Sequence, residues 1–316
     1  MAGLRFPAAL LTALALLGCG GGDSSGPTEG RAPAETIPAS ATGSGVPLCA
    51  RLRAEVTGHV DSGAATELSG LVLSRSQPGV LWTHNDSGNP ARVFAVAPDG
   101  RLLADLAVRG AENVDWEDIA IGAAPQGGDA LYLGDIGDNL ANRSSVVVYR
   151  VPEPRLGGGP RSSTAPAESL RLRYPDRAHD AEALLVDPSN GALLIVTKSF
   201  VGPARLYVAD NPSAGAATTM RAAGDLPLGS GEPVTAGDVS ANGRTIVLRT
   251  YDRAFVWSRH RGETLAAALR RRPCAARADL LAEGQGEALA LTPDGRAFYT
   301  VPEGERPALR RYAPAG

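Results

Sequence analysis

The sequence predicts an all-β protein that forms a single β-propeller, with five four-stranded blades and a ring closed by the N-terminal strand. Three observations predict this fold. A seven-residue pattern occurs five times, strands joined by tight turns follow each copy, and the last copy runs out of chain before its fourth strand. Units of four antiparallel strands, repeated about every fifty residues, are typical of propellers. Two alternatives stay open: six blades, which need one more inner strand, and a β-sandwich with accidental periodicity.

The repeated pattern supplies the first strand of each blade. Its copies are ELSGLVL from Glu67, DWEDIAI from Asp115, DAEALLV from Asp180, TAGDVSA from Thr235 and QGEALAL from Gln285. Their third positions are separated by 48, 65, 55 and 50 residues, and their fifth positions are all Leu, Ile or Val. A turn, such as the one at residues 188 to 190, then leads into a second apolar strand, so each copy begins a hairpin.

The remaining strands complete the blades. A third and a fourth strand follow the first hairpin as ARVFAVAP and LLADLAVRG, and similar pairs follow the next three hairpins. The fifth blade ends after ALRRYAP, but residues 50 to 60 have strand character and belong to no other blade. We therefore expect residues 50 to 60 to pair beside residues 308 to 313 and close the ring. Residues 259 to 272, RHRGETLAAALRRR, break the strand pattern and predict a short helix with a basic face in blade four.

The N-terminal region has the layout of an export signal. Residues 1 to 19 contain a basic Arg5, an apolar stretch and small residues before Cys19, and they are too short for a membrane span. Their last four residues, LLGC, resemble a bacterial lipobox, which implies a lipoprotein signal peptide and a lipidated Cys19. An ordinary secretory signal is the alternative. Residues 20 to 47 predict a disordered Gly/Ser/Pro-rich tether, and residues 48 to 316 are left for the propeller domain. The chain is thus expected to be exported and anchored by lipid to the membrane of the cell envelope, as a monomer.

Charge and cysteine content narrow the partners. The formal net charge is −3, the isoelectric point is about 5.9, and no basic run is interleaved with aromatic residues, so nucleic acid is not expected as a partner. If Cys19 carries lipid, only Cys49 and Cys274 remain, and an exported compartment allows them to form a disulfide. Two unpaired buried thiols are the alternative. Lys198 is the only lysine, since all other basic residues among the 31 are arginine.

The third positions of the repeat predict a metal site. The first strands of a propeller line its axis, so the third residues of four blades should face one another: Ser69, Glu117, Glu182 and Glu287. Blade four would contribute the carbonyl near Gly237 or the side chain of Asp238. Carboxylates confined together repel and raise one another's pKa unless a cation sits among them. In an exported protein Ca²⁺ is the natural candidate, because it takes six to eight oxygen ligands in flexible geometry. The alternative is a water-filled polar channel with partly protonated carboxylates.

These motifs resemble those of the calcium-dependent apyrases. The match is clearest in ELSGL with Ser69, in WEDIA with Glu117 and in GEALAL with Glu287. Glu182 in HDAEAL fits more loosely, and Gly237 stands where a hydroxyl ligand would be expected. The resemblance implies a five-bladed propeller with calcium on its axis. The family hydrolyses nucleoside diphosphates, but its acidic and phosphate-handling residues cannot be carried over one by one. The sequence also resembles a broad group of uncharacterised exported bacterial propeller lipoproteins.

Polar residues end the second strand of every blade. In antiparallel hairpins the end of the second strand lies beside the start of the first, so these residues should gather at one mouth of the propeller. They are His84, Asn85 and Asp86 in blade one, Asp135, Asp138 and Asn139 in blade two, Lys198 in blade three, Arg249 and Tyr251 in blade four, and Glu303 in blade five. Such convergence predicts a ligand site. Turn chemistry alone is the alternative for NDSG and GDIGDN.

Two classes of function fit these features. The first, which we prefer, is a binding module that holds calcium and whose mouth binds a small anionic or carbohydrate ligand or a surface protein. The second is a calcium-dependent hydrolase of a phosphoester, nucleotide or similar substrate. In it Asp118 or Asp135 would activate water, and Lys198 and Arg249 would stabilise negative charge. Residues 48 to 316 contain no Gly-x-Ser-x-Gly elbow, Cys-x-x-Cys pair, phosphate loop or zinc spacing, which disfavours serine-hydrolase, redox and kinase chemistry.

Overall fold

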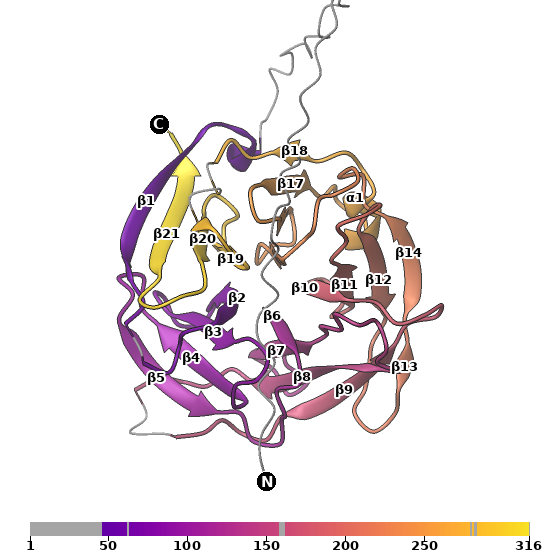
Figure 1. Cartoon of the computed structure of the whole chain (residues 1–316), viewed down its shortest axis with the longest axis horizontal. Coiled ribbons are helices and arrows are strands. Elements are labelled where there is room, and N and C mark those ends of the chain that lie inside the picture. Colours follow the sequence, from indigo (N-terminus) through magenta and orange to yellow (C-terminus); the bar gives the residue numbers. More distant parts are fainter. Residues whose placement is uncertain (1–45, 62, 158–161, 279, 281–282, 316) are drawn as a thin grey trace, which may run out of the picture. The chain divides into compact units, whose positions relative to one another are not determined.

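The computed structural model describes residues 46–61, 63–157, 162–278, 280 and 283–315. All of them lie in one compact unit, Gly43–Gly316, whose five sheets are arranged as the blades of a β-propeller around a common axis (Figure 1). The predicted fold, with five blades, is confirmed. The predicted signal peptide, its Cys19 and nearly all of the tether lie outside the described residues. In the described part of the chain, no helix is long and apolar enough to cross a membrane.

Four strands build each blade, in order from the axis outward. Blade one consists of β2 (Leu68–Leu73), β3 (Leu81–Asn85), β4 (Arg92–Val96) and β5 (Leu102–Ala107). Blade two consists of β6 (Trp116–Ala123), β7 (Asp129–Asp135), β8 (Val146–Pro152) and β9 (Glu168–Arg173). Blade three consists of β10 (Ala181–Val186), β11 (Leu193–Thr197), β12 (Arg205–Ala209) and β14 (Arg221–Asp225), while β13 (Thr218–Thr219) pairs in parallel with β9 of blade two. Blade four consists of β15 (Ala236–Val239), β16 (Thr245–Arg249), β17 (Ala254–Ser258) and β18 (Cys274–Ala275).

Blade five is built from both ends of the described chain. It consists of β19 (Ala288–Leu291), β20 (Phe298–Val301), β21 (Ala308–Pro314) and, as its outermost strand, β1 (Leu52–His59). The β1 strand pairs antiparallel with β21, with Ala54 opposite Tyr312, and a bulge lies between Val56 and Gly58. The predicted closure of the ring by the N-terminal strand is therefore confirmed.

Burial explains why the inner strands are mostly apolar, apart from the acidic residues near their starts. Each inner strand contacts the inner strands of both neighbouring blades, so both of its faces are covered. The six residues of β10, AEALLV, are all buried, as are the four of β19, ALAL. Outer strands have one face in water, and β9 alternates between buried and more exposed positions. The hydrophobic core is thus divided among the seams between adjacent blades.

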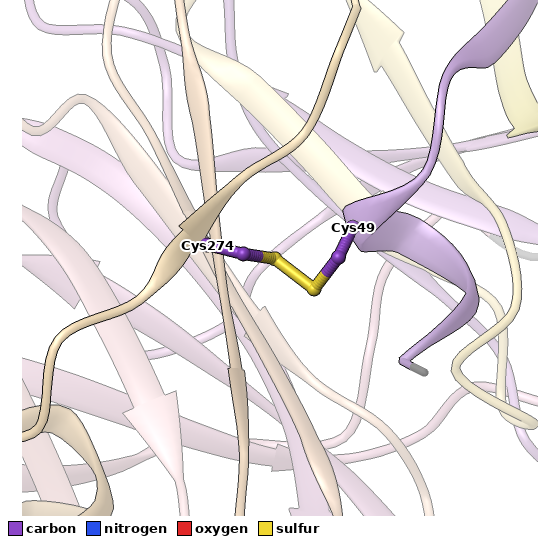
Figure 2. The surroundings of a disulfide bond; sticks show 2 residues. All are labelled: Cys49 and Cys274. Atoms are coloured by element: carbon purple, nitrogen blue, oxygen red, sulfur yellow. A yellow bond between two sulfur atoms is a disulfide. The ribbon is translucent and has the colours of Figure 1, made fainter. Parts of the chain in front are cut away.

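The predicted helix and the predicted disulfide both lie in blade four. The segment predicted to be helical contains the short helix α1 (Leu265–Leu269). This helix begins after Thr264, whose side chain accepts a hydrogen bond from the N–H of Ala267. A disulfide joins Cys49, at the end of the 3₁₀ turn η1 (Pro47–Cys49), to Cys274 in β18, with 5.7 Å between the Cα atoms (Figure 2). The bridge fastens the chain just before β1 to the neighbouring blade.

Candidate metal centre at the channel mouth

Carboxylates from three blades converge where the inner strands begin, a region that we call the mouth. Two groups of three have oxygen atoms that all lie within 4.8 Å of one another. One group is Asp86, Asp115 and Glu117, and the other is Asp86, Glu287 and Glu303. Asp86, which follows β3, belongs to both groups. Blades one, two and five therefore bring five carboxylates together at spacings that could hold a metal ion.

A glycine leaves the space that this cluster occupies. A Cβ atom added at Gly137 would lie 2.1 Å from Oε1 of Glu117 and 2.5 Å from Oδ2 of Asp115. Any side chain at position 137 would displace these two carboxylates. Gly137 belongs to the GDIGDN stretch after β7, so the sequence of this loop is fitted to the acidic residues beside it.

Burial and mutual repulsion raise the pKa of several of these carboxyl groups. Burial, followed by the nearby carboxylates of Glu182 and Asp86, raises the pKa of Glu117 well above its usual range. Burial raises the pKa of Asp86 to about 6. The pKa of Glu303 rises to about 8, through burial and then through its hydrogen bond with Glu287. Without an added cation, the mouth therefore holds fewer charges than its count of carboxyl groups.

Glu182 has one oxygen paired and one free. Its Oε1 accepts a hydrogen bond from Nζ of Lys198, while its Oε2 is buried and has no hydrogen-bond partner among the described residues. The residue is only 4% exposed. Burial raises the pKa of Glu182 well above its usual range, although Lys198 acts in the opposite direction. A buried, unpaired carboxylate oxygen is costly and marks a place for a cation.

Lys198 and Tyr251 complete the mouth on the side of blades three and four. Nζ of Lys198 lies 5.3 Å from the centre of the Tyr251 ring, and the Tyr251 hydroxyl donates to Oε1 of Glu287 at 3.2 Å. Burial lowers and the Glu182 carboxylate raises the pKa of Lys198, with a net rise, so this lysine stays charged. Among the described residues, it is the one basic side chain paired with a member of the predicted ring.

The two groups of three carboxylates contain only part of the predicted ring, which consists of Ser69, Glu117, Glu182 and Glu287. Glu117 and Glu287 belong to them, whereas Glu182 faces Lys198. Ser69 donates its hydroxyl to the backbone carbonyl of Glu117 at 2.6 Å. Blade four contributes no side chain at Gly237, because a Cβ there would lie 2.4 Å from a methyl carbon of Leu248. The packing of that blade explains its departure from the repeat.

The structure places Asp118 and Arg249, two of the candidate catalytic residues, in buried networks of hydrogen bonds and ion pairs. Asp118 is fully buried, and its two oxygens accept the N–H groups of Ile119, Leu184 and Gly237. The blade-four candidate Asp238 is also buried, with its oxygens on the N–H groups of Val239 and Leu291.

Arg249 points between blades four and five rather than toward a ligand. It is 0% exposed, and its Nη1 lies 3.0 Å from Oε2 of Glu283 and donates to the carbonyl of Ala288 at 3.1 Å. The same Glu283 accepts hydrogen bonds from the hydroxyls of Thr300 and Tyr312. This ion pair is a structural link between blades, and it engages the guanidinium that was expected to bind a ligand.

Of the three residues of blade one that were expected at the mouth, one lies there and two are buried within the fold. His84 is fully buried against Trp116, its Nδ1 lies 3.0 Å from the carbonyl of Asn85, and burial lowers its pKa to about 4, so it is neutral. Asn85 is buried and donates to the carbonyl of Ala64 at 2.6 Å. Only Asp86 of this trio reaches the carboxylate cluster.

Turn chemistry accounts for the expected mouth residues of blade two. Asp135 forms an ion pair with Arg143 at 2.7 Å, and Asp138 accepts the backbone N–H groups of Asn142 and Arg143. Asn139 is exposed. The structure therefore leaves Asp86, Lys198, Tyr251 and Glu303 as the mouth residues with direct access to the cluster.

Asp115 is a site residue that the sequence reasoning missed. It occupies the first position of the repeat, where Glu67 and Asp180 stand in blades one and three. Asp180 lines the same region, and its Oδ1 accepts the N–H of Asp138 at 2.9 Å. The signal in the sequence is that three of the five first positions of the repeat are acidic, as are three of the five third positions.

Comparisons with known proteins give structural neighbours only. No family model matches the sequence, and no curated protein matches it. One similar solved structure is a gluconolactonase from Xanthomonas campestris, with 14% identity, a TM-score of 0.47, and coverage of 84% of this chain and 92% of that one. Another is the PQQ-bound form of an aldose sugar dehydrogenase from Streptomyces coelicolor, with 11% identity, a TM-score of 0.49, and coverage of 84% and 98%. No substrate or cofactor of this chain follows from either likeness.

Proposed function

We propose that this chain is a calcium-binding propeller of the cell envelope, whose mouth binds an anionic or carbohydrate ligand through the bound ion. The observation that carries the proposal is the pair of three-oxygen groups that share Asp86. Oxygen-only donors of this kind suit Ca²⁺, which tolerates irregular geometry and several carboxylates, better than Mg²⁺, which demands a near-octahedral shell. The free buried oxygen of Glu182 is a second, independent indication of a missing positive charge.

The position of the cluster supports ligand binding through the ion. Asp86, Asp115 and Glu303 are partly exposed, whereas Glu117 and Glu287 are buried, so the cluster is reached from one side. An ion held there keeps positions for water or for ligand oxygens, because the described carboxylates approach it from blades one, two and five only. Paired hydroxyls of a sugar, a carboxylate or a phosphate are the groups that would fill such positions.

Basic residues beside the cluster favour the anionic class of ligand. A hollow of about 350 Å³ lies next to Lys198, and its lining includes Arg177, Arg205, Thr197 and Ser199. Arg177 is exposed and forms no ion pair with another described residue. An anionic group in this hollow would lie close to Lys198 while the rest of the ligand reaches the ion.

Export and lipid anchoring belong to the same proposal. The disulfide between Cys49 and Cys274 supports an oxidising compartment. The lipobox-like LLGC ending at Cys19 supports anchoring to the envelope, with the propeller acting as a monomer. Mass spectrometry of the membrane fraction would test it, since the mature N-terminus should be a lipidated Cys19.

Calcium titration tests the metal site. Residues 43 to 316, which contain the whole compact unit, should bind Ca²⁺ in isothermal titration calorimetry after treatment with chelator. Asp86→Asn should lower the affinity roughly tenfold or more, because it weakens both oxygen groups. Asp210→Asn is the matched control, because Asp210 is exposed and follows β12 of blade three. This variant should bind Ca²⁺ as the wild-type protein does. Absence of calcium binding by the wild-type protein would refute the proposal.

A hydrolase is the second candidate, and Glu303 is the observation that favours it. With a pKa near 8 and a hydrogen bond to Glu287, Glu303 can hold a proton at neutral pH beside a second carboxyl group. Bound calcium would polarise a substrate oxygen, and Lys198 would stabilise negative charge beside it. A panel of phosphoester, nucleotide, lactone and glycoside substrates, assayed with calcium and with chelator, separates the two classes. Calcium-dependent turnover that is abolished by Glu303→Gln would show that the protein is a hydrolase rather than a binding module.

A further inference from the structure

A strongly basic surface lies on the outer edge of blades four and five. Residues 259 to 277 contain six arginines and one acidic residue, in a chain whose net charge is −3. The fold adds two arginines of the N-terminal strand region to this segment, because Arg51 forms a β-bridge with Arg277. Five of the exposed arginines, which we name the basic edge, are Arg51, Arg53, Arg270, Arg272 and Arg277.

Among the described residues, no carboxylate forms an ion pair with an arginine of the basic edge. The one acid of the segment, Glu263, is already paired with Arg271 at 3.0 Å. On β1, Glu55 lies opposite Arg311 of β21. The described part of the chain therefore leaves these five positive charges available to an anionic partner.

The positive surface continues onto the turns of blade four. A hollow of about 530 Å³ is lined by Arg244, Arg259, His260 and Arg261. Arg259 is bound to Asp187 at 2.8 Å, but Arg244 and Arg261 are exposed and form no ion pair with a described residue. This hollow is large enough to hold an anionic headgroup.

The basic edge lies where the N-terminal segment joins the propeller. Cys49 is bridged to Cys274, which stands between Arg272 and Arg277 in the chain (Figure 2). The first described residues, from residue 46 to Cys49, therefore lie beside the basic edge.

We propose that the basic edge docks the propeller onto an anionic phospholipid surface. Each arginine near such a surface contributes attraction that falls off within a Debye length, and clusters of four to eight basic residues are typical of segments that bind anionic lipids. The carboxylates of the mouth lie near the propeller axis, away from the outer strands, and the same surface would repel them. The propeller should therefore sit edge-on, with its mouth in the aqueous phase. This docking involves neither the metal site nor Cys19, so it stands apart from both.

Vesicle sedimentation tests the proposal with residues 43 to 316, which carry no lipid. The protein should bind vesicles of phosphatidylcholine mixed with phosphatidylglycerol, should ignore pure phosphatidylcholine, and should be released as salt is raised. Arg270→Gln/Arg272→Gln/Arg277→Gln should lower the binding constant roughly tenfold to a hundredfold.

The matched control removes the same charge from the outer strands of blades two and three. Arg171→Gln/Arg173→Gln/Arg221→Gln should bind anionic vesicles nearly as wild type does, since these exposed arginines lie on β9 and β14. Unchanged melting temperatures would show that both triple variants fold. Equal losses in the two triple variants would show non-specific attraction, and binding to neither kind of vesicle would equally overturn the proposal.

Discussion

Asp118 and Asp238 occupy the same position of the repeat, and each carboxylate accepts an N–H from the inner strand of the next blade. Asp118 binds the N–H of Leu184 at 2.9 Å and, further on, that of Gly237 at 3.2 Å. Asp238 binds the N–H of Leu291 at 2.8 Å. These two residues connect the inner strands of blades two to five around the axis.

Removal of Asp118 should therefore destabilise the ring rather than impair ligand binding. Asp118→Ala leaves three backbone N–H groups without their acceptor, and the free energy of unfolding should fall by about 2–5 kcal/mol. Denaturant unfolding measures the change. Asp225→Ala, at an exposed position of β14, is the control and should cost much less. An equal cost for both variants would show that the Asp118 hydrogen bonds contribute little.

Stability of the calcium-free protein should fall as pH rises from about 4 to about 8. Folding raises the pKa of Asp86 to about 6, of Asp238 to about 7 and of Glu303 to about 8. Between the unfolded and the folded pKa values, the folded state binds more protons, so each unit of rising pH favours unfolding. Melting temperatures in chelator, measured across this range, check the sign. Calcium favours the ionised carboxylates, so its stabilising effect should grow with pH, and a stability that rises with pH in chelator would contradict the proposed cluster.

Lys198 should compete with the proposed calcium ion for Glu182, whose Oε1 it already contacts. Lys198→Gln removes the cation that neutralises Oε1 of Glu182, so the affinity for calcium should rise by roughly three- to tenfold. Calorimetry measures the affinity, and Arg177→Gln, which changes a charge in the same hollow without a contact to Glu182, is the matched control. A loss of calcium binding in the Lys198 variant would mean that the lysine supports the site instead.

The buried pair of Arg249 and Glu283 should be costly to break from one side. Arg249→Met leaves the Glu283 carboxylate buried without its cation and should lower the free energy of unfolding by about 3–5 kcal/mol. Adding Glu283→Gln should recover part of this loss, because a neutral amide at that position can still accept from Thr300 and Tyr312. Thermal or denaturant unfolding of the single and double variants decides. A double variant no more stable than the single one would argue against the ion pair.

Loss of the disulfide should destabilise the propeller without changing its calcium affinity. The bridge spans 225 residues, and its removal should cost about 2–5 kcal/mol. Unfolding of Cys49→Ala/Cys274→Ala, compared with wild type, measures this. Reductant should lower the stability of wild type only, and a response of the double variant to reductant would reveal a different thiol effect.

The repeat predicted the fold because propeller blades impose a strong constraint on sequence. Inner strands covered on both faces must be apolar, so copies such as DAEALLV and QGEALAL stand out against the loops. The closing strand followed from a strand count, and the disulfide from the pair of cysteines left after Cys19. These features depend on order along the chain, which the sequence displays directly.

The site was less predictable because strand position fixes neither depth nor direction. Arg249 ends its strand at the level of the mouth, yet its guanidinium turns toward blade five to pair with Glu283. Asp118 follows Glu117 immediately, and the alternation of side chains directs it away from the carboxylate cluster. Both outcomes depend on contacts with another blade, which no local pattern displays.

The closure of the ring by β1 and β21 has a consequence for synthesis. The strand that completes blade five leaves the ribosome long before its partner strand β21. Cys49 is likewise synthesised 225 residues ahead of Cys274. The earlier segment therefore has neither its backbone partner nor its disulfide partner until these later residues have been made. A helper that shields exposed strand edges would act during this interval, and the speed of synthesis would set how long the interval lasts.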